Sequence, residues 1–179
     1  MREEPKDLWV YEREAFAEGY QTVCGVDEAG RGPLAGPVCA AAVILPAGLV
    51  IDGLNDSKKL TDKKRRELYD VITQNAVSYG IAMASEREID EINILQATFL
   101  AMQRALDKLS IKADLALIDG NRAKDFGLPV RTIVKGDMPD ALSSTYGINA
   151  AKWRSAQWFF PRNMAACARP AARRLCCKR

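Results

Sequence analysis

Residues 22–45, TVCGVDEAGRGPLAGPVCAAAVIL, decide the fold. This segment holds two apolar runs, Thr22–Val26 and Pro37–Leu45, and between them lie two acidic residues and a glycine-rich stretch. The second run contains β-branched residues and shows no helical stripe, which predicts a buried strand closed by the Pro-Ala-Gly turn at 46–48. The core is therefore expected to begin with a pair of strands.

The chain continues with a helix and a third strand. Residues 61–74 are mostly charged, with apolar side chains on one side, so they predict a surface helix that is N-capped by Thr61. Residues 76–84, AVSYGIAMA, predict a strand. Three strands before any long helix suggest an antiparallel meander.

A long amphipathic helix is predicted from Ser85 to Leu109. Ser85 and Glu88 match a capping box. Apolar residues then recur at three- and four-residue steps, which predicts that they are core: Leu95, Phe99, Met102, Leu106 and Leu109. Two short strands follow at 115–118 and 131–134, and their order relative to the helix implies parallel additions to the sheet of an α/β fold.

The composition excludes several classes of protein. Apolar residues make up 48% of the 179 residues, so the chain is not disordered. No stretch approaches the roughly 18 apolar residues of a membrane span. Residues 1–10 lack the apolar region of a signal peptide, so a cytoplasmic location is expected. The five cysteines form no C-x-x-C pair, and Cys24 and Cys39 are expected to be small buried hydrophobes in strands.

The sequence contains no histidine, which removes Ser-His-Asp catalysis and histidine-ligated zinc. Acidic residues instead follow three predicted strands, as Asp27-Glu28, Asp119 and Asp137. Carboxylates that converge at one sheet edge repel each other unless a cation lies among them, and oxygen ligands favour Mg²⁺ or Mn²⁺. Two such ions activate a water and stabilise the leaving oxygen of a phosphodiester. The alternative is that each acid is a turn residue or helix cap.

A glycine-rich segment, GRGPLAGP at 30–37, follows these acids and places Arg31 between Gly30 and Gly32. Glycines let a backbone approach a ligand closely, and free N–H groups bind phosphate. The spacing matches neither a Walker A loop nor a dinucleotide-binding fingerprint. A tight turn between strands explains the glycines as well, but it explains neither the arginine nor the preceding acids.

Five blocks in this order resemble bacterial type 2 ribonucleases H, the ribonuclease HII family. They are GVDEAGRGPLAGPV at 25–38, DSKKLT at 56–61, INILQATFLAM at 92–102, LIDGN at 117–121 and VKGD at 134–137. The resemblance implies a ribonuclease H-like α/β fold, with a mixed five-stranded sheet flanked by helices. It implies an Mg²⁺- or Mn²⁺-dependent endonuclease that hydrolyses the RNA strand of RNA–DNA hybrids, cuts at ribonucleotides embedded in duplex DNA and leaves 5′-phosphates.

The same resemblance implies roles for individual residues. Asp27, Glu28, Asp119 and Asp137 match the family's catalytic, metal-binding carboxylates. Gly30, Arg31 and Gly32 match the loop that lies against the ribose 2′-hydroxyls, the groups that distinguish RNA from DNA. Lys58, Lys59 and Asn93 resemble residues that contact phosphate in the family. For the two lysines, a solvated charged turn remains the alternative.

The resemblance stops after Asp137. Residues 138–179 hold eight basic residues and one acidic residue, a net charge of +7, whereas residues 1–137 carry −4. We expect an N-terminal extension at 1–20, a ribonuclease H type 2 core at 21–137 and an atypical tail at 138–179. The tail is interpreted as truncated or out of frame, with a lineage-specific basic arm as the alternative. Two functions therefore stand side by side: an active, monomeric endonuclease, and a truncated member that binds metal or nucleic acid without turnover.

Overall fold

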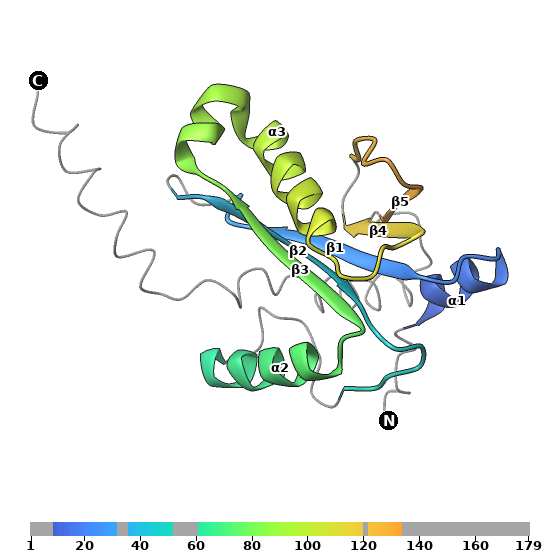
Figure 1. The fold of residues 1–179 in the computed structure, drawn as a ribbon. Coiled ribbons are helices and arrows are strands. Elements are labelled where there is room, and N and C mark those ends of the chain that lie inside the picture. Colours follow the sequence, from blue (N-terminus) through green and yellow to red (C-terminus); the bar gives the residue numbers. More distant parts are fainter. Residues whose placement is uncertain (1–8, 32–35, 52–60, 120–121, 134–179) are drawn as a thin grey trace, which may run out of the picture.

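A five-stranded sheet with helices on both faces forms the molecule in Figure 1, a computed structural model that describes residues 9–31, 36–51, 61–119 and 122–133. The strands lie in the order β3-β2-β1-β4-β5. Their bounds are β1 Val23–Ala29, β2 Val38–Ile44, β3 Ser78–Ala84, β4 Leu115–Asp119 and β5 Val130–Ile133. The first three form an antiparallel meander, and β4 and β5 add in parallel beside β1. The predicted mixed five-stranded α/β sheet is confirmed.

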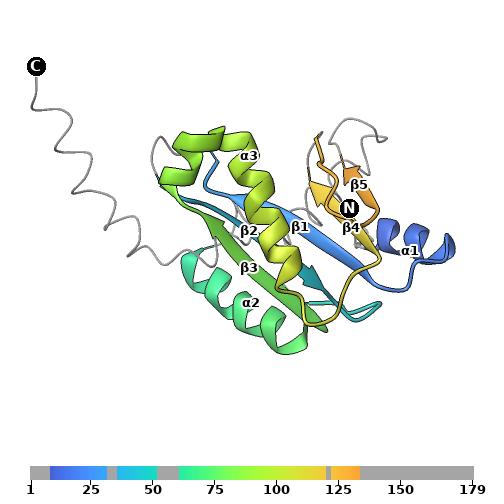
Figure 2. The ribbon, with the colours of Figure 1, turned by 45° about the horizontal axis from the view of Figure 1, so that its top comes forward.

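Three helices of the described residues flank the sheet, and the two ribbon views show α3 on one face and α2 on the other (Figures 1 and 2). Their bounds are α1 Val10–Ala17, α2 Asp62–Asn75 and α3 Glu86–Asp107. The predicted helix starts are confirmed. Thr61 caps α2 by accepting a hydrogen bond from the Lys64 backbone N–H at 3.3 Å. Ser85 and Glu88 form both bonds of the predicted capping box.

The core between α3 and the sheet contains many small side chains. Alanines from β2 and β3 meet alanines from α3, and the set is Ala40, Ala42, Ala82, Ala84, Ala97, Ala101 and Ala105. Such residues allow a helix to approach a sheet closely. At Gly80 a β-carbon would lie only 2.1 Å from the Ala105 carbonyl oxygen, so this position admits no side chain. The predicted core positions Phe99, Met102, Leu106 and Leu109 are buried, and Leu95 packs against them.

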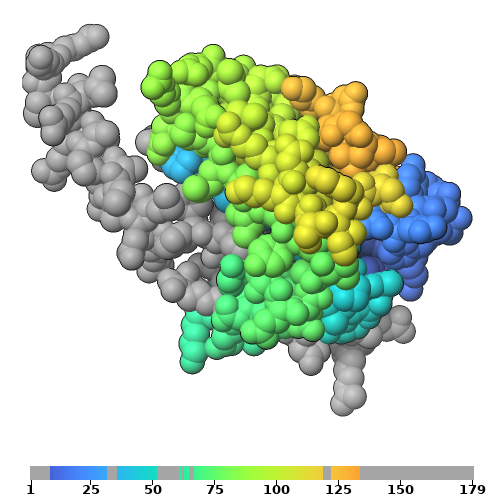
Figure 3. Space-filling model, in the orientation of Figure 1, coloured from blue at the N-terminus to red at the C-terminus, as the bar shows by residue number. Residues whose placement is uncertain are grey.

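The opposite face of the sheet is covered by α2 and α1. Val43 of β2 packs against Leu68 and Ile72 of α2. Ala15 of α1 packs against Val23 and Leu115. Arg131 of β5 forms ion pairs with Glu14 of α1 and with Glu18, which follows the helix. The space-filling view shows the N-terminal part of the chain, in blue, beside the yellow and orange parts that hold β4 and β5 (Figure 3). None of the helices among the described residues is long and apolar enough to cross a membrane.

One sequence expectation changes in detail. The strand that begins the core continues through Asp27 and Glu28 to Ala29, because backbone pairing with β2 extends to the Ala29–Cys39 pair. The two acids thus lie within β1 rather than after it. Cys24 and Cys39 are buried strand residues, as predicted, and burial raises the pKa of these thiols to about 12 and about 11.

Candidate functional site

The site starts from the last residues of β1. The Asp27 side chain is only 3% exposed, and its Oδ1 accepts a hydrogen bond of 2.8 Å from the Glu28 backbone N–H. Side chains alternate along a strand. Asp27 therefore lies on the same side as Val23 and Ala29, which face away from α3, and Glu28 lies on the side that α3 covers.

The second acidic position lies at the end of β4. This strand runs parallel to β1, and its register pairs Val26 with Ile118. Asp119, the last residue of β4, directly follows that pair, so its backbone lies beside Asp27 at the carboxyl ends of two adjacent parallel strands. In an open α/β sheet such adjacent ends are where ligands bind.

The remainder of the predicted carboxylate set lies outside the described residues. This holds for the Asp119 side chain and for the whole of Asp137. Among the side chains that are described, no group of three or more histidine, cysteine or acidic residues could hold a metal ion. Asp27 and Glu28 are the two members of the predicted ligand set whose side chains the structure places.

The glycine-rich turn leaves β1 at Gly30. Gly30 has φ +93°, and a β-carbon there would lie 2.6 Å from the carbonyl oxygen of Pro37, so only glycine fits. Arg31 follows, and its guanidinium lies 3.6 Å from the Glu28 carboxylate. The turn therefore places a half-exposed cation beside a predicted ligand acid. Gly32 lies outside the described residues, as do Lys58 and Lys59.

Asn93 lies at a kink that the sequence analysis did not predict. Its backbone, with φ 67° and ψ 162°, is not helical and divides α3 into segments 86–92 and 94–107. The Asn93 Oδ1 accepts hydrogen bonds of 3.1 Å from the backbone N–H groups of Leu95 and Gln96, so this exposed residue is the N-cap of the second segment. Asparagine followed three residues later by glutamine resembles a capping box, and that signal was present in the sequence.

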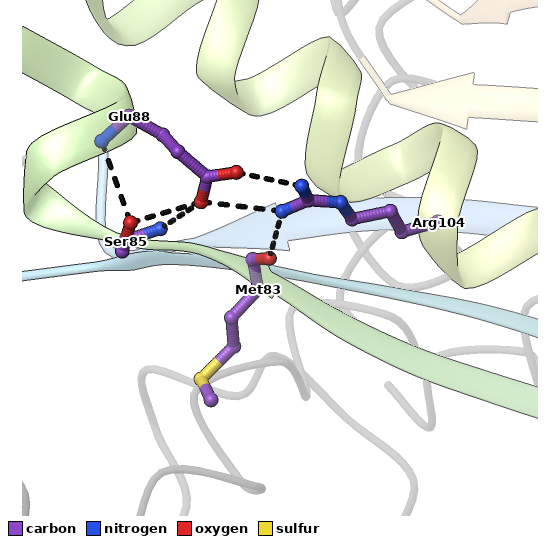
Figure 4. A network of polar contacts seen from close by, with 4 residues as sticks. All are labelled: Met83, Ser85, Glu88 and Arg104. Atoms are coloured by element: carbon purple, nitrogen blue, oxygen red, sulfur yellow. Dashed lines mark hydrogen bonds and ion pairs between the residues drawn. The ribbon is translucent and has the colours of Figure 1, made fainter. Parts of the chain in front are cut away.

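A polar network connects the two segments of α3, and it was not predicted either (Figure 4). The Arg104 guanidinium donates to both carboxylate oxygens of Glu88, at 2.6 and 3.2 Å, and to the Met83 carbonyl oxygen at 2.9 Å. The Arg104 guanidinium and the bonds from Ser85 lower the pKa of Glu88 to about 2. No local sequence signal indicates a pair 16 residues apart.

Solved ribonuclease H structures share this α/β fold. One is the ribonuclease H2 of Pyrococcus horikoshii, with a TM-score of 0.65, 24% identity, and coverage of 83% of this chain and 76% of that chain. Another is Bst-RNase HIII in complex with Mn²⁺, with a TM-score of 0.57, 18% identity, and coverage of 88% and 57%. At these identities the likeness concerns the fold.

The sequence comparisons define the family. The family model described as Ribonuclease HII matches residues 24–142. The ribonuclease HII of Caldicellulosiruptor saccharolyticus is 51% identical over 126 residues, which is 70% of this chain and 62% of the relative. The ribonuclease HII of Dechloromonas aromatica is 58% identical over 115 residues, 64% of this chain and 59% of the relative. The chain belongs to the ribonuclease HII family, and it spans about three fifths of the length of these two relatives.

Proposed function

We propose that this chain is an endonuclease that hydrolyses the RNA strand of RNA–DNA hybrids and cuts at single ribonucleotides embedded in duplex DNA. The reaction is attack of water on phosphorus beside a ribonucleotide, which leaves a 5′-phosphate and a 3′-hydroxyl. One observation carries the proposal: in a chain of the ribonuclease HII family, buried Asp27 lies beside the position of Asp119 at the ends of adjacent parallel strands.

The residues at this sheet edge suit a hard divalent cation. The described donors, Asp27 and Glu28, offer only carboxylate oxygens, which Mg²⁺ and Mn²⁺ prefer over softer ligands. We propose that these two residues, together with Asp119 and Asp137, hold two such ions. When bound, the ions would activate the attacking water and stabilise the leaving oxygen. A bound cation would offset the cost of burying the Asp27 carboxylate.

The protein's own groups would select and orient the substrate. The Gly30-Arg31-Gly32 segment is proposed to lie against the ribose 2′-hydroxyl, because glycines let a backbone approach a ligand closely. At Gly30 the missing β-carbon makes room for the Pro37 carbonyl oxygen, so there the glycine shapes the turn. Arg31 supplies a guanidinium for phosphate within reach of Glu28. Lys58 and Lys59 are proposed as further phosphate contacts, which fix the duplex without reading its sequence.

Asn93 fits a phosphate contact for a separate reason. Its side-chain oxygen is occupied by the helix N-cap, so the amide N–H₂ is the group that would donate to a ligand. Asn93→Asp retains a capping oxygen and replaces the donor with a negative charge. We expect this variant to keep its helix content and to lose hybrid affinity by about tenfold, because a carboxylate repels phosphate.

The test of the proposed function is cleavage of a duplex that carries one ribonucleotide, in Mg²⁺ and in Mn²⁺. The proposal expects a single cut beside the ribonucleotide, with a 5′-phosphate product, and no cut in the all-DNA duplex. Cleavage of the all-DNA duplex at a similar rate would remove the assignment of sugar discrimination to this site.

A second candidate function is binding of metal or nucleic acid without turnover. The observation that favours it is that the family model matches residues 24–142 and leaves the basic residues 143–179 unmatched. In this case the chain retards the hybrid in a gel and yields no product with either metal. The +7 charge of residues 138–179 would then dominate binding, and affinity would fall steeply with salt.

The remaining assignments belong to the same proposal. We propose a ribonuclease H type 2 core at 21–137 between an N-terminal extension at 1–20 and a basic tail at 138–179. RNA–DNA hybrid and ribonucleotide-containing DNA are the proposed partners, bound by a monomer in the cytoplasm. Sedimentation of the purified chain with and without a hybrid duplex tests the stoichiometry.

A further inference from the structure

The kink in α3 is a strained feature that the surrounding structure must hold. At φ 67° and ψ 162°, Asn93 occupies a region of backbone conformation that is almost restricted to glycine. A residue other than glycine stays there only when its neighbours over-determine it, and such residues cluster at functional sites. The N-cap bonds from Leu95 and Gln96 hold the residue locally. They do not fix the angle between the two helical segments.

The Glu88–Arg104 ion pair restrains the angle between the two helical segments. Glu88 lies in the segment before the kink and Arg104 in the segment after it, so their bidentate ion pair ties the two segments together (Figure 4). Arg104 also donates to the carbonyl oxygen of Met83 in β3, the strand that leads into the helix. The side chains are only partly exposed, 41% for Arg104 and 29% for Glu88, so solvent screens this pair less than a fully exposed one.

The kink lies at the proposed substrate edge of the sheet. The register pairs Ala84 with Val38, and Ala29 with Cys39, so β3 and β1 end at the same edge, and α3 begins there. The segment after the kink packs on the side of the sheet to which Val26 points, and strand alternation places Glu28 on that side too. Asn93 and the Glu28–Arg31 pair therefore lie at the same edge of the sheet and on the same face, the one that α3 covers.

We propose that Glu88 and Arg104 are positioning residues for nucleic-acid binding. They hold the α3 kink so that the Asn93 amide and the start of the second helical segment meet the backbone of the bound duplex. The proposal rests on the proposed function for its ligand, an RNA–DNA hybrid. The restraint on the kink itself is independent of any ligand, so the two can fail separately.

The test compares Arg104→Met with Arg87→Met in the full chain. Both variants remove one positive charge from α3. Among the described residues, Arg87 pairs with Glu91 on the surface, and the two side chains are 90% and 59% exposed. Amide hydrogen exchange reports on the kink through Leu95 and Gln96, with Ala101 and Met102 as references in the same helix. Fluorescence anisotropy measures the Kd for a hybrid duplex in Ca²⁺, and cleavage in Mn²⁺ separates KM from kcat.

In Arg104→Met we expect protection of the Leu95 and Gln96 amides to fall by about tenfold relative to the references, as loss of a charge-assisted restraint predicts. The Kd and KM for the hybrid should rise by about fivefold with kcat within about twofold, because the ligand carboxylates are untouched. Arg87→Met should show neither change, and Arg104→Lys should recover part of the protection.

Equal loss of protection throughout α3 would overturn the proposal, since it would mean that Arg104 only stabilises the fold. An equal rise in Kd for both variants would overturn it as well, because charge alone would then explain the effect. If the unaltered chain neither binds nor cuts the hybrid, the proposed function fails, and the exchange of Leu95 and Gln96 still decides whether the pair holds the kink.

Discussion

Replacing Gly30 with alanine tests the geometry of the turn between β1 and β2. Two penalties arise at this position. The residue has φ +93°, a conformation that L side chains rarely adopt, and the new β-carbon would lie 2.6 Å from the Pro37 carbonyl oxygen. That distance is shorter than any contact that a methyl carbon makes with an oxygen, so the backbone at Pro37 or at residue 30 has to move.

The two penalties can be separated with a control in the same protein. Gly48 also has a positive φ, +74°, but a β-carbon there meets nothing within 4 Å. Gly48→Ala therefore bears only the conformational cost, about 1 kcal/mol. Gly30→Ala bears that cost together with the overlap, about 1–3 kcal/mol more, as for other overpacked sites. We expect a total loss of about 2–4 kcal/mol for Gly30→Ala.

Urea denaturation followed by circular dichroism measures both variants. The slope of the free energy of unfolding against urea should stay at the value of the unaltered chain, and the midpoint should fall further for Gly30→Ala than for Gly48→Ala. Equal losses for the two variants would refute the close approach to Pro37. If Gly30→Ala had the same urea midpoint as the unaltered chain, the positive φ of Gly30 would be refuted as well.

Other predictions follow from the same structure. Gly80→Ala should destabilise by about 2–3 kcal/mol in urea denaturation, because its β-carbon would lie 2.1 Å from the Ala105 oxygen; an unchanged midpoint would exclude this contact between β3 and α3. The Glu88 pKa is lowered from 4.5 to about 2, so its stabilising effect is complete above pH 4.5 and is lost as the pH falls towards 2. The difference in stability between the unaltered chain and Glu88→Gln should therefore be constant above pH 4.5 and shrink below it; a constant difference down to pH 2 would contradict the lowered pKa.

Local patterns in the sequence were sufficient to predict most of the fold. The apolar run at 37–45 became β2, and Thr61 and Ser85 capped the helices that they were expected to cap. These features depend on neighbours close in the chain, such as the backbone N–H groups of the first helical turn. The length of β1 depends on pairing with a distant residue, Cys39. The local pattern therefore predicted that the strand ends before Asp27 and Glu28, whereas both residues lie within it.

The residues of the candidate site were proposed from the sequence, and part of their geometry follows from the strand pairing. Asp27 and Asp119 were expected at one sheet edge, and the parallel pairing of β1 with β4 places their backbones side by side. The opposite orientation of Asp27 and Glu28 follows from strand alternation once β1 is known to reach Ala29. The Arg104 contacts with Glu88 and Met83 join positions 16 and 21 residues apart, which no local pattern encodes.

Cleavage by the Asp27→Asn variant tests the central claim most directly. The change removes one carboxylate charge and keeps the shape of a side chain that is almost fully buried. The substrate is a labelled duplex with one ribonucleotide, incubated with Mg²⁺ or Mn²⁺, and circular dichroism checks that the variant is folded. Our account predicts a metal-dependent cut beside the ribonucleotide by the unaltered chain and a loss of at least about a hundredfold in rate for Asp27→Asn, as for removal of a group that stabilises charge in the transition state. A folded Asp27→Asn variant that cuts at a near-normal rate, or cutting by the unaltered chain that persists in EDTA, would contradict it.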